Sequence, residues 1–192
     1  MNKSIELIHD EHRALAAMLS AFRSLAREIR AGRQQADFGL FELMLRYIEK
    51  LPEKVHHPKE NEFLFKKLRA RCAEAVPVIE QLEDEHRQGE HRIAALRAAL
   101  AAYQESGAAG FEPFYAVLAS YIDSEWRHMN TEEKQVFPLA EAHLSAADWA
   151  EIEAAFLAND NPWQGAAGEY AELFSRIVNT APAPVRLGAP LK

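Results

Sequence analysis

The sequence has little of what several large classes of protein require. Its one cysteine, Cys72, excludes an intramolecular disulfide and the four-cysteine zinc sites, and suits a reducing compartment. The formal net charge is −7 and basic residues form no long cluster, which argues against nucleic acid or anionic membranes as partners. No apolar run approaches the ~18 residues of a membrane span, and none precedes the first charged residues. We therefore expect a cytoplasmic protein that contacts neither nucleic acid nor membrane.

What the chain does contain is strong helical periodicity. Only 8 of its 192 residues are glycine, and 48% are hydrophobic, which is ordinary for a soluble helical domain. Along four segments the apolar residues recur at alternating steps of three and four, the spacing of one helix face. Connectors near residues 31–37, 71–77 and 105–113 separate these segments. Because short connectors favour antiparallel neighbours, the sequence predicts an all-α, up-down-up-down four-helix bundle.

Local signals predict where several helices begin and end. Ser4 is the expected N-cap of the first helix, and Gly32 is its expected stop. Ser145 and Asp148 have the spacing of a capping box, so a short fifth helix should begin there.

The C-terminal part of the chain has weaker periodicity. A sixth short helix is expected at about residues 169–178, followed by a proline-rich tail. We therefore divide the chain into a bundle, residues 1–142, and a helical extension with a proline-rich tail, residues 143–192. The extension is expected to pack on the bundle or to form the contact of a homodimer.

A duplicated motif is the most informative feature of the sequence. The tetrapeptide Asp-Glu-His-Arg occurs at residues 10–13 and again at residues 84–87. Each copy is followed, at nearly the same distance, by a histidine with a glutamate four residues later, a spacing that places both side chains on one helix face. These pairs are His56 with Glu60 and His128 with Glu132. The chain is thus predicted to contain two copies of one helical hairpin.

The histidines of both motifs fall in the middle of apolar stripes. His12 and His86 are flanked on both sides by core positions, and so are His128 and Glu132. Burying an unpaired imidazole or carboxylate is costly, so a hydrogen-bonded network or a metal must compensate it. The duplicated spacing favours a metal, because helical bundles with inward histidines and carboxylates hold di-iron or di-manganese centres. A structural network is the alternative.

These motifs resemble the hemerythrin-like HHE cation-binding domain family. The matching segments are residues 8–13, 56–65, 84–87 and 128–138. The resemblance implies two iron ions (Fe²⁺/Fe³⁺), bridged by two glutamates together with an oxo or hydroxo group. Carried over position by position, the implied ligands are His12, His56, Glu60, His86, His128 and Glu132.

The resemblance also implies a seventh ligand, for which two residues compete. His57 follows His56 directly but lies about 100° away on a regular helix, so its use requires a distorted backbone. Pro58 supplies a reason for such a distortion, and we favour His57. The rival is Glu90, one turn after His86, where oxygen-carrying hemerythrins have a second histidine.

Four further residues near the motifs have other expected roles. His9 lies one step off the apolar stripe and is expected to face a neighbour or solvent rather than metal. Glu125 lies on the stripe and is either a partner of a metal-bound histidine or part of a water channel. Glu133 is expected to be a solvent-exposed neighbour of the site rather than a metal ligand. Gly89, which replaces a larger residue of the first hairpin, is expected to open a pocket beside one iron.

The function implied by the resemblance is binding or sensing of O2, NO or peroxide, within an oxidative or nitrosative stress response. A histidine-rich site supplies few anionic oxygens to stabilise high-valent iron, which favours ligand binding over oxygenase chemistry. Whether the protein turns over a substrate as an enzyme is left open. The alternatives are iron storage, iron-availability sensing or Fe–S cluster repair, and lastly a structural bundle that holds zinc or no metal.

Overall fold

The computed structural model describes residues 3–157, and these residues form helices with no β-strand among them. The predicted all-α class is therefore confirmed for this part of the chain. The first arm is α1 (Lys3–Arg30), and the third is a short 3₁₀ turn (Ala73–Ala75) followed by α5 (Val76–Ser106). The second arm runs without a break through α2 (Phe38–Ile48), a π-helical segment (Glu49–His56), α3 (His57–Lys59), a second π-helical segment (Glu60–Phe65) and α4 (Lys66–Arg71). The fourth runs through α6 (Ala108–Thr131), a π-helical segment (Glu132–Val136) and α7 (Phe137–His143).

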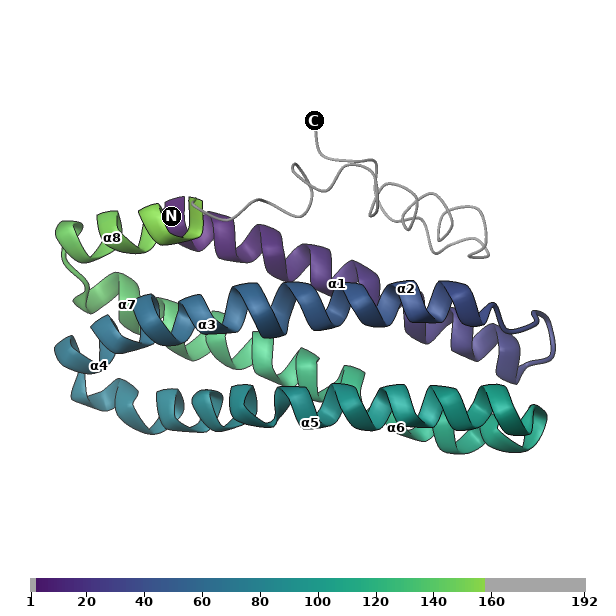
Figure 1. The fold of residues 1–192 in the computed structure, drawn as a ribbon. Coiled ribbons are helices and arrows are strands. Elements are labelled where there is room, and N and C mark those ends of the chain that lie inside the picture. The colour runs from purple at the N-terminus through teal and green to yellow at the C-terminus, as the bar shows by residue number, and fades with distance from the viewer. Residues whose placement is uncertain (1–2, 158–192) are drawn as a thin grey trace.

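The four arms lie side by side, and successive arms run in opposite directions (Figure 1). The contacts between arms close a ring, because α1 and α5 each touch both α2 and α6. A last described helix, α8 (Ala146–Leu157), packs against the beginning of α1 (Figure 1). None of the helices within residues 3–157 combines the length and apolar character that a membrane span requires.

The helix ends agree with the sequence at some positions and differ at others. Gly32 stops the first arm as predicted, with a positive φ of 69° that glycine adopts without strain. Ser4 is not a cap, because it lies inside α1, where its hydroxyl donates to the carbonyl of Trp149 at 3.4 Å. The predicted connector 105–113 is also wrong. Gly107 alone, at φ 62°, separates α5 from α6.

The beginning of α8 confirms the predicted capping box. The backbone N–H of Asp148 donates to the Ser145 hydroxyl at 3.2 Å, and the Ser145 N–H donates to the Asp148 carboxylate at 3.0 Å. The buried residues of α8 are Asp148, Trp149, Ile152 and Phe156. The expected sixth helix and the proline-rich tail lie outside the described residues.

The core consists of two apolar clusters with a polar layer between them. Along α1, Ile8 belongs to one cluster and Leu15 to the other, while His12 lies between them. The other arms repeat this order, so buried histidines and glutamates of all four arms meet in one layer. The fold therefore places the histidines of the motifs and the glutamates of the His/Glu pairs together, away from solvent.

Candidate metal centre

A widened backbone in the second arm turns two adjacent histidines inward. The backbone N–H of His57 donates to the carbonyl of Pro52, five residues earlier, which is the hydrogen bond of a π-helix. Pro58 follows at once. Its ring has no N–H to donate and crowds the carbonyl four residues before it, so a regular helix is disfavoured here. As a result both His56 and His57 are at least 96% buried, although neighbours on a regular helix point about 100° apart.

The fourth arm has the same distortion at its metal motif. The N–H of Phe137 donates to the carbonyl of Glu132, again five residues earlier, and Pro138 follows. The π-helical segment begins at Glu132 itself. Both hairpins therefore place a widened turn, followed by a proline, beside their His/Glu pair.

The buried side chains form two groups whose candidate ligand atoms all lie within 4.8 Å of one another. The first group is His12, His56, Glu60 and Glu132, and the second is His57, Glu60, His86 and His128. In the first, the Nε2 atoms of His12 and His56 are 3.1 Å apart. In the second, the Nε2 atoms of His86 and His128 are 2.9 Å apart. Glu60 belongs to both groups.

Glu132 lies between the two groups and turns one carboxylate oxygen toward each. Its Oε2 is 3.2 Å from Nε2 of His12, in the first group. Its Oε1 is 3.2 Å from Nε2 of His128, in the second. A carboxylate placed in this way can serve both groups at once.

Glu60 has the same arrangement from the opposite hairpin. Its Oε1 is 3.2 Å from Nε2 of His56 and its Oε2 is 3.7 Å from Nε2 of His86. The Glu60 and Glu132 side chains have no exposed surface, and none of their four carboxylate oxygens accepts a well-aligned hydrogen bond, although histidine Nε2 atoms approach them. Buried carboxylates without donors are rare in folded proteins, and a bound cation is a common reason for them.

The electrostatics of the layer agree with cation binding. Burial, together with the neighbouring Glu132, raises the pKa of Glu60. Burial and the charges of nearby histidines, His86 first, hold the pKa of His57 well below its usual range. Burial and His128 lower the pKa of His86 to about 3. Neutral imidazole is the form that binds a metal, so His57 and His86 fit that role. The other three histidines differ: burial opposes it, but neighbouring glutamates raise the pKa of His12, His56 and His128. A metal binding at these three positions would displace their protons.

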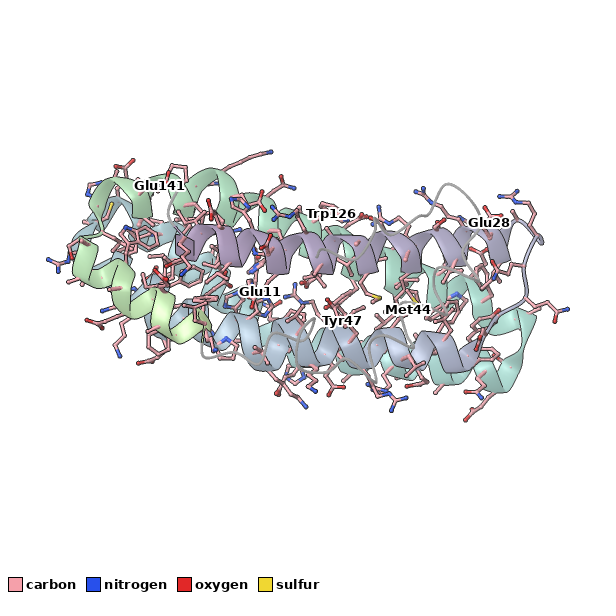
Figure 2. All side chains as sticks on the ribbon, turned by 90° about the horizontal axis from the view of Figure 1, so that it is seen from above. Glu11, Glu28, Met44, Tyr47, Trp126 and Glu141 are labelled. Atoms are coloured by element: carbon pink, nitrogen blue, oxygen red, sulfur yellow. The ribbon has the colours of Figure 1, made fainter. Side chains whose placement is uncertain are left out.

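The duplicated motif has a second role in the structure, in which its glutamates hold the histidines of the following arm. Nδ1 of His56 lies 2.6 Å from the Glu11 carboxylate, between α1 and the second arm (Figure 2). Nδ1 of His128 lies 2.8 Å from Glu85. Because a carboxylate only accepts, Nδ1–H must donate, which leaves the Nε2 lone pair for a metal.

The motif histidines of the first and third arms are each held by a residue of the opposite hairpin. Nδ1 of His12 lies 3.0 Å from Glu133, and Nδ1 of His86 lies 2.8 Å from the amide oxygen of Asn61. The expectation that Glu133 is only a solvent-exposed neighbour of the site is therefore wrong. One sequence signal could have identified all four partners. Glu11 and Glu85 directly precede the motif histidines, and Asn61 and Glu133 directly follow the glutamates of the two His/Glu pairs.

The remaining candidates lie outside the two groups. His9 is partly exposed and its Nδ1 is 3.3 Å from Glu133, so it belongs to a third, more open group with His12 and Glu133. Glu125 is buried, and burial raises its pKa, but it joins neither group. Glu90 is exposed. Of the two rivals for the seventh position, the structure brings His57 to the centre and leaves Glu90 at the surface.

The expected pocket at Gly89 is absent from the described residues, because another side chain fills it. A Cβ atom at residue 89 would overlap the carboxylate of Glu53. Burial, with the charge of nearby Glu125, raises the pKa of Glu53 to about 7. Gly89 thus makes room for a buried carboxylate of the second arm.

The histidine partners give a first testable prediction. Glu11→Ala and Glu85→Ala should each weaken metal binding about 10–100-fold, since such partners fix the orientation and tautomer of a ligand. Metal affinity is measured by competition with a chromophoric chelator. Asp84→Ala is the matched control, because Asp84 belongs to the same motif but is exposed and pairs with Arg87. Equal affinities for all three variants would show that the carboxylates do not orient the histidines.

The comparisons with known proteins agree with this geometry. Residues 3–140 match the family described as the hemerythrin HHE cation binding domain. No curated protein and no solved structure gives a significant match to the chain. The family match covers more than half of the chain and includes all the residues of both buried groups. The chain therefore belongs to the hemerythrin HHE cation-binding domain family.

Proposed function

We propose that the chain is a non-haem di-iron protein that binds or senses O2, NO or peroxide. The observation that carries the proposal is the pair of buried carboxylates, Glu60 and Glu132. Each turns toward both histidine groups, and neither accepts a well-aligned hydrogen bond. We read the ring of antiparallel arms as the up-down-up-down four-helix bundle in which such centres occur.

The proposed ligands divide unequally between the two ions. One ion would be held by two histidines and the other by three, with Glu60 and Glu132 available to both. The histidines are His12 and His56 for the first ion and His57, His86 and His128 for the second. When bound, iron would supply the ability to take up a diatomic gas or peroxide. Because the first group has fewer protein ligands, we place the exogenous ligand on that side.

The choice of iron over zinc follows from the donor set. Structural zinc sites are closed and tetrahedral, with four ligands to one ion. Here two groups share carboxylates, the arrangement of di-iron and di-manganese bundles. The five histidines against two glutamates leave little anionic charge to stabilise high-valent metal, which favours ligand binding over oxygenase chemistry.

Aromatic side chains keep the centre rigid and dry. The Phe137 ring stacks on His12 at a centroid distance of 6.0 Å, and Phe65 stacks on His86 at 5.7 Å. Both phenylalanines are buried members of the apolar cluster nearer α8. They limit rotation of the imidazoles and exclude water, so the histidines keep their orientation before a ligand arrives.

The test is a set of anaerobic absorption spectra of iron-loaded, reduced protein before and after addition of NO, O2 or hydrogen peroxide. We expect a new absorption band with at least one of these ligands. The double variant Glu60→Ala/Glu132→Ala, treated identically, should give none. Iron-loaded protein whose spectrum none of the three ligands changes would contradict ligand binding and leave iron storage as the better account.

A further inference from the structure

A surface pocket of about 300 Å³ lies between the second arm and α5, near the three-histidine group. Its charged lining consists of Glu49, Glu53, Lys54, Glu90 and Arg97. The two basic residues are already engaged with Glu49: Arg97 contacts it at 2.9 Å and Lys54 at 3.4 Å. Glu53 and Glu90 are the carboxylates left without such a partner among the described residues.

Glu53 is the innermost of these groups. Its side chain is 96% buried, and its Oε1 has no hydrogen-bond donor within residues 3–157. Its Oε2 is 3.6 Å from Nδ1 of His57, close enough for contact but too far for a hydrogen bond. The nearby guanidinium of Arg92 donates instead to the backbone carbonyl of Glu85. Glu53 thus lines the pocket on one side and touches a proposed ligand on the other.

Gly89 explains how this carboxylate is accommodated. Any Cβ at residue 89 would overlap the Glu53 carboxylate, so only glycine leaves its place free. The overlapping atoms are the far end of a flexible side chain, which can swing aside. The absence of a side chain on α5 therefore leaves room for the Glu53 carboxylate at the inner end of the pocket.

We propose that this pocket is the entrance for a divalent cation, which Glu90 attracts at the surface and Glu53 receives at the inner end. The inference rests on the proposed metal centre, to which it supplies a route. From Glu53 the cation passes to His57 and the rest of the three-histidine group. Carboxylate oxygens are ligands that divalent cations take, and these two carboxylates form no ion pair with a lysine or arginine among the described residues.

The test measures how fast metal-free protein takes up Co²⁺, whose absorption bands report coordination by histidine and carboxylate. Glu53→Gln keeps the shape of the side chain and removes its charge, so uptake should slow about tenfold or more, since charge-lined clefts change association rates by this order. The final cobalt content should stay that of the unchanged protein. Gly89→Ala keeps the charge but displaces the carboxylate, and it should slow uptake as well.

The matched control is Glu62→Gln, which removes the same charge from the exposed side of the same arm, where Glu62 pairs with Lys66. Its uptake rate should stay close to that of the unchanged protein. An unchanged rate of Co²⁺ uptake in Glu53→Gln, or an equally slowed rate in Glu62→Gln, would contradict the proposal that the cation enters through this pocket. The final cobalt content of the unchanged protein tests the metal centre separately from the entrance pocket. If the unchanged protein binds no Co²⁺, the metal centre itself is contradicted.

Discussion

Alanine in place of Glu132 should lower the iron content from about two ions per chain to below one, and Glu60→Ala should do the same. Each of these carboxylates turns one oxygen toward each histidine group, so its loss removes a ligand from both ions. It also removes a negative charge that offsets the metal charge in a buried layer. By contrast, His12→Ala affects the first group only and should leave about one ion bound.

Iron content is measured by elemental analysis against protein concentration, after loading and removal of unbound metal. Glu62→Ala is a suitable control, because Glu62 lies two residues from Glu60 but is exposed. We expect the iron content to be highest in the unchanged protein and in Glu62→Ala, lower in His12→Ala, and lowest in Glu60→Ala and Glu132→Ala. Glutamate variants that retain both ions would show that the carboxylates do not bridge.

Removal of the metal should lower the thermal midpoint of unfolding by about 5–10 °C. Without a cation, the carboxylate oxygens of Glu60 and Glu132 are buried and accept no well-aligned hydrogen bond. Two pairs of histidines, His12 with His56 and His86 with His128, also place their Nε2 atoms close together. A cation bound at 100 times its dissociation constant adds about 2.7 kcal/mol to the free energy of unfolding. For a domain of this size each kcal/mol corresponds to about 2–4 °C.

This prediction is checked by thermal unfolding, followed by circular dichroism, of the iron-loaded protein with and without a chelator. The double variant Glu60→Ala/Glu132→Ala controls for effects of the chelator itself, and its midpoint should not move. Identical midpoints for the loaded and metal-free forms of the unchanged protein would mean that the layer is already satisfied without metal. A structural hydrogen-bonded network would then be the better description.

The sequence predicted the helical class well because its periodicity is long and regular. Gly32 and the capping box at Ser145 are local signals, and both appear in the structure. The connector after α5 was overestimated, since Gly107 with its positive φ makes the turn alone. The π-helical segments could not be predicted in detail. A proline such as Pro58 can break a helix or widen it, and packing of the distant arms decides between these outcomes.

The candidate site was predictable where residues lie on the apolar stripe, and less so elsewhere. Glu11 lies one position off the stripe of α1, so periodicity alone gives it no role in the site. Its long side chain nevertheless reaches His56 on the next arm. Glu53 was missed for a different reason. Its burial depends on the space above Gly89, which belongs to another helix and leaves no mark in the second arm.

The central claim is that two metal ions share Glu60 and Glu132. Anomalous X-ray scattering at the iron edge, from crystals of iron-loaded protein, tests it most directly. We expect two peaks, one beside His12 and His56 and one beside His57, His86 and His128, with the two carboxylates between them. A single peak, or peaks away from these side chains, would contradict it.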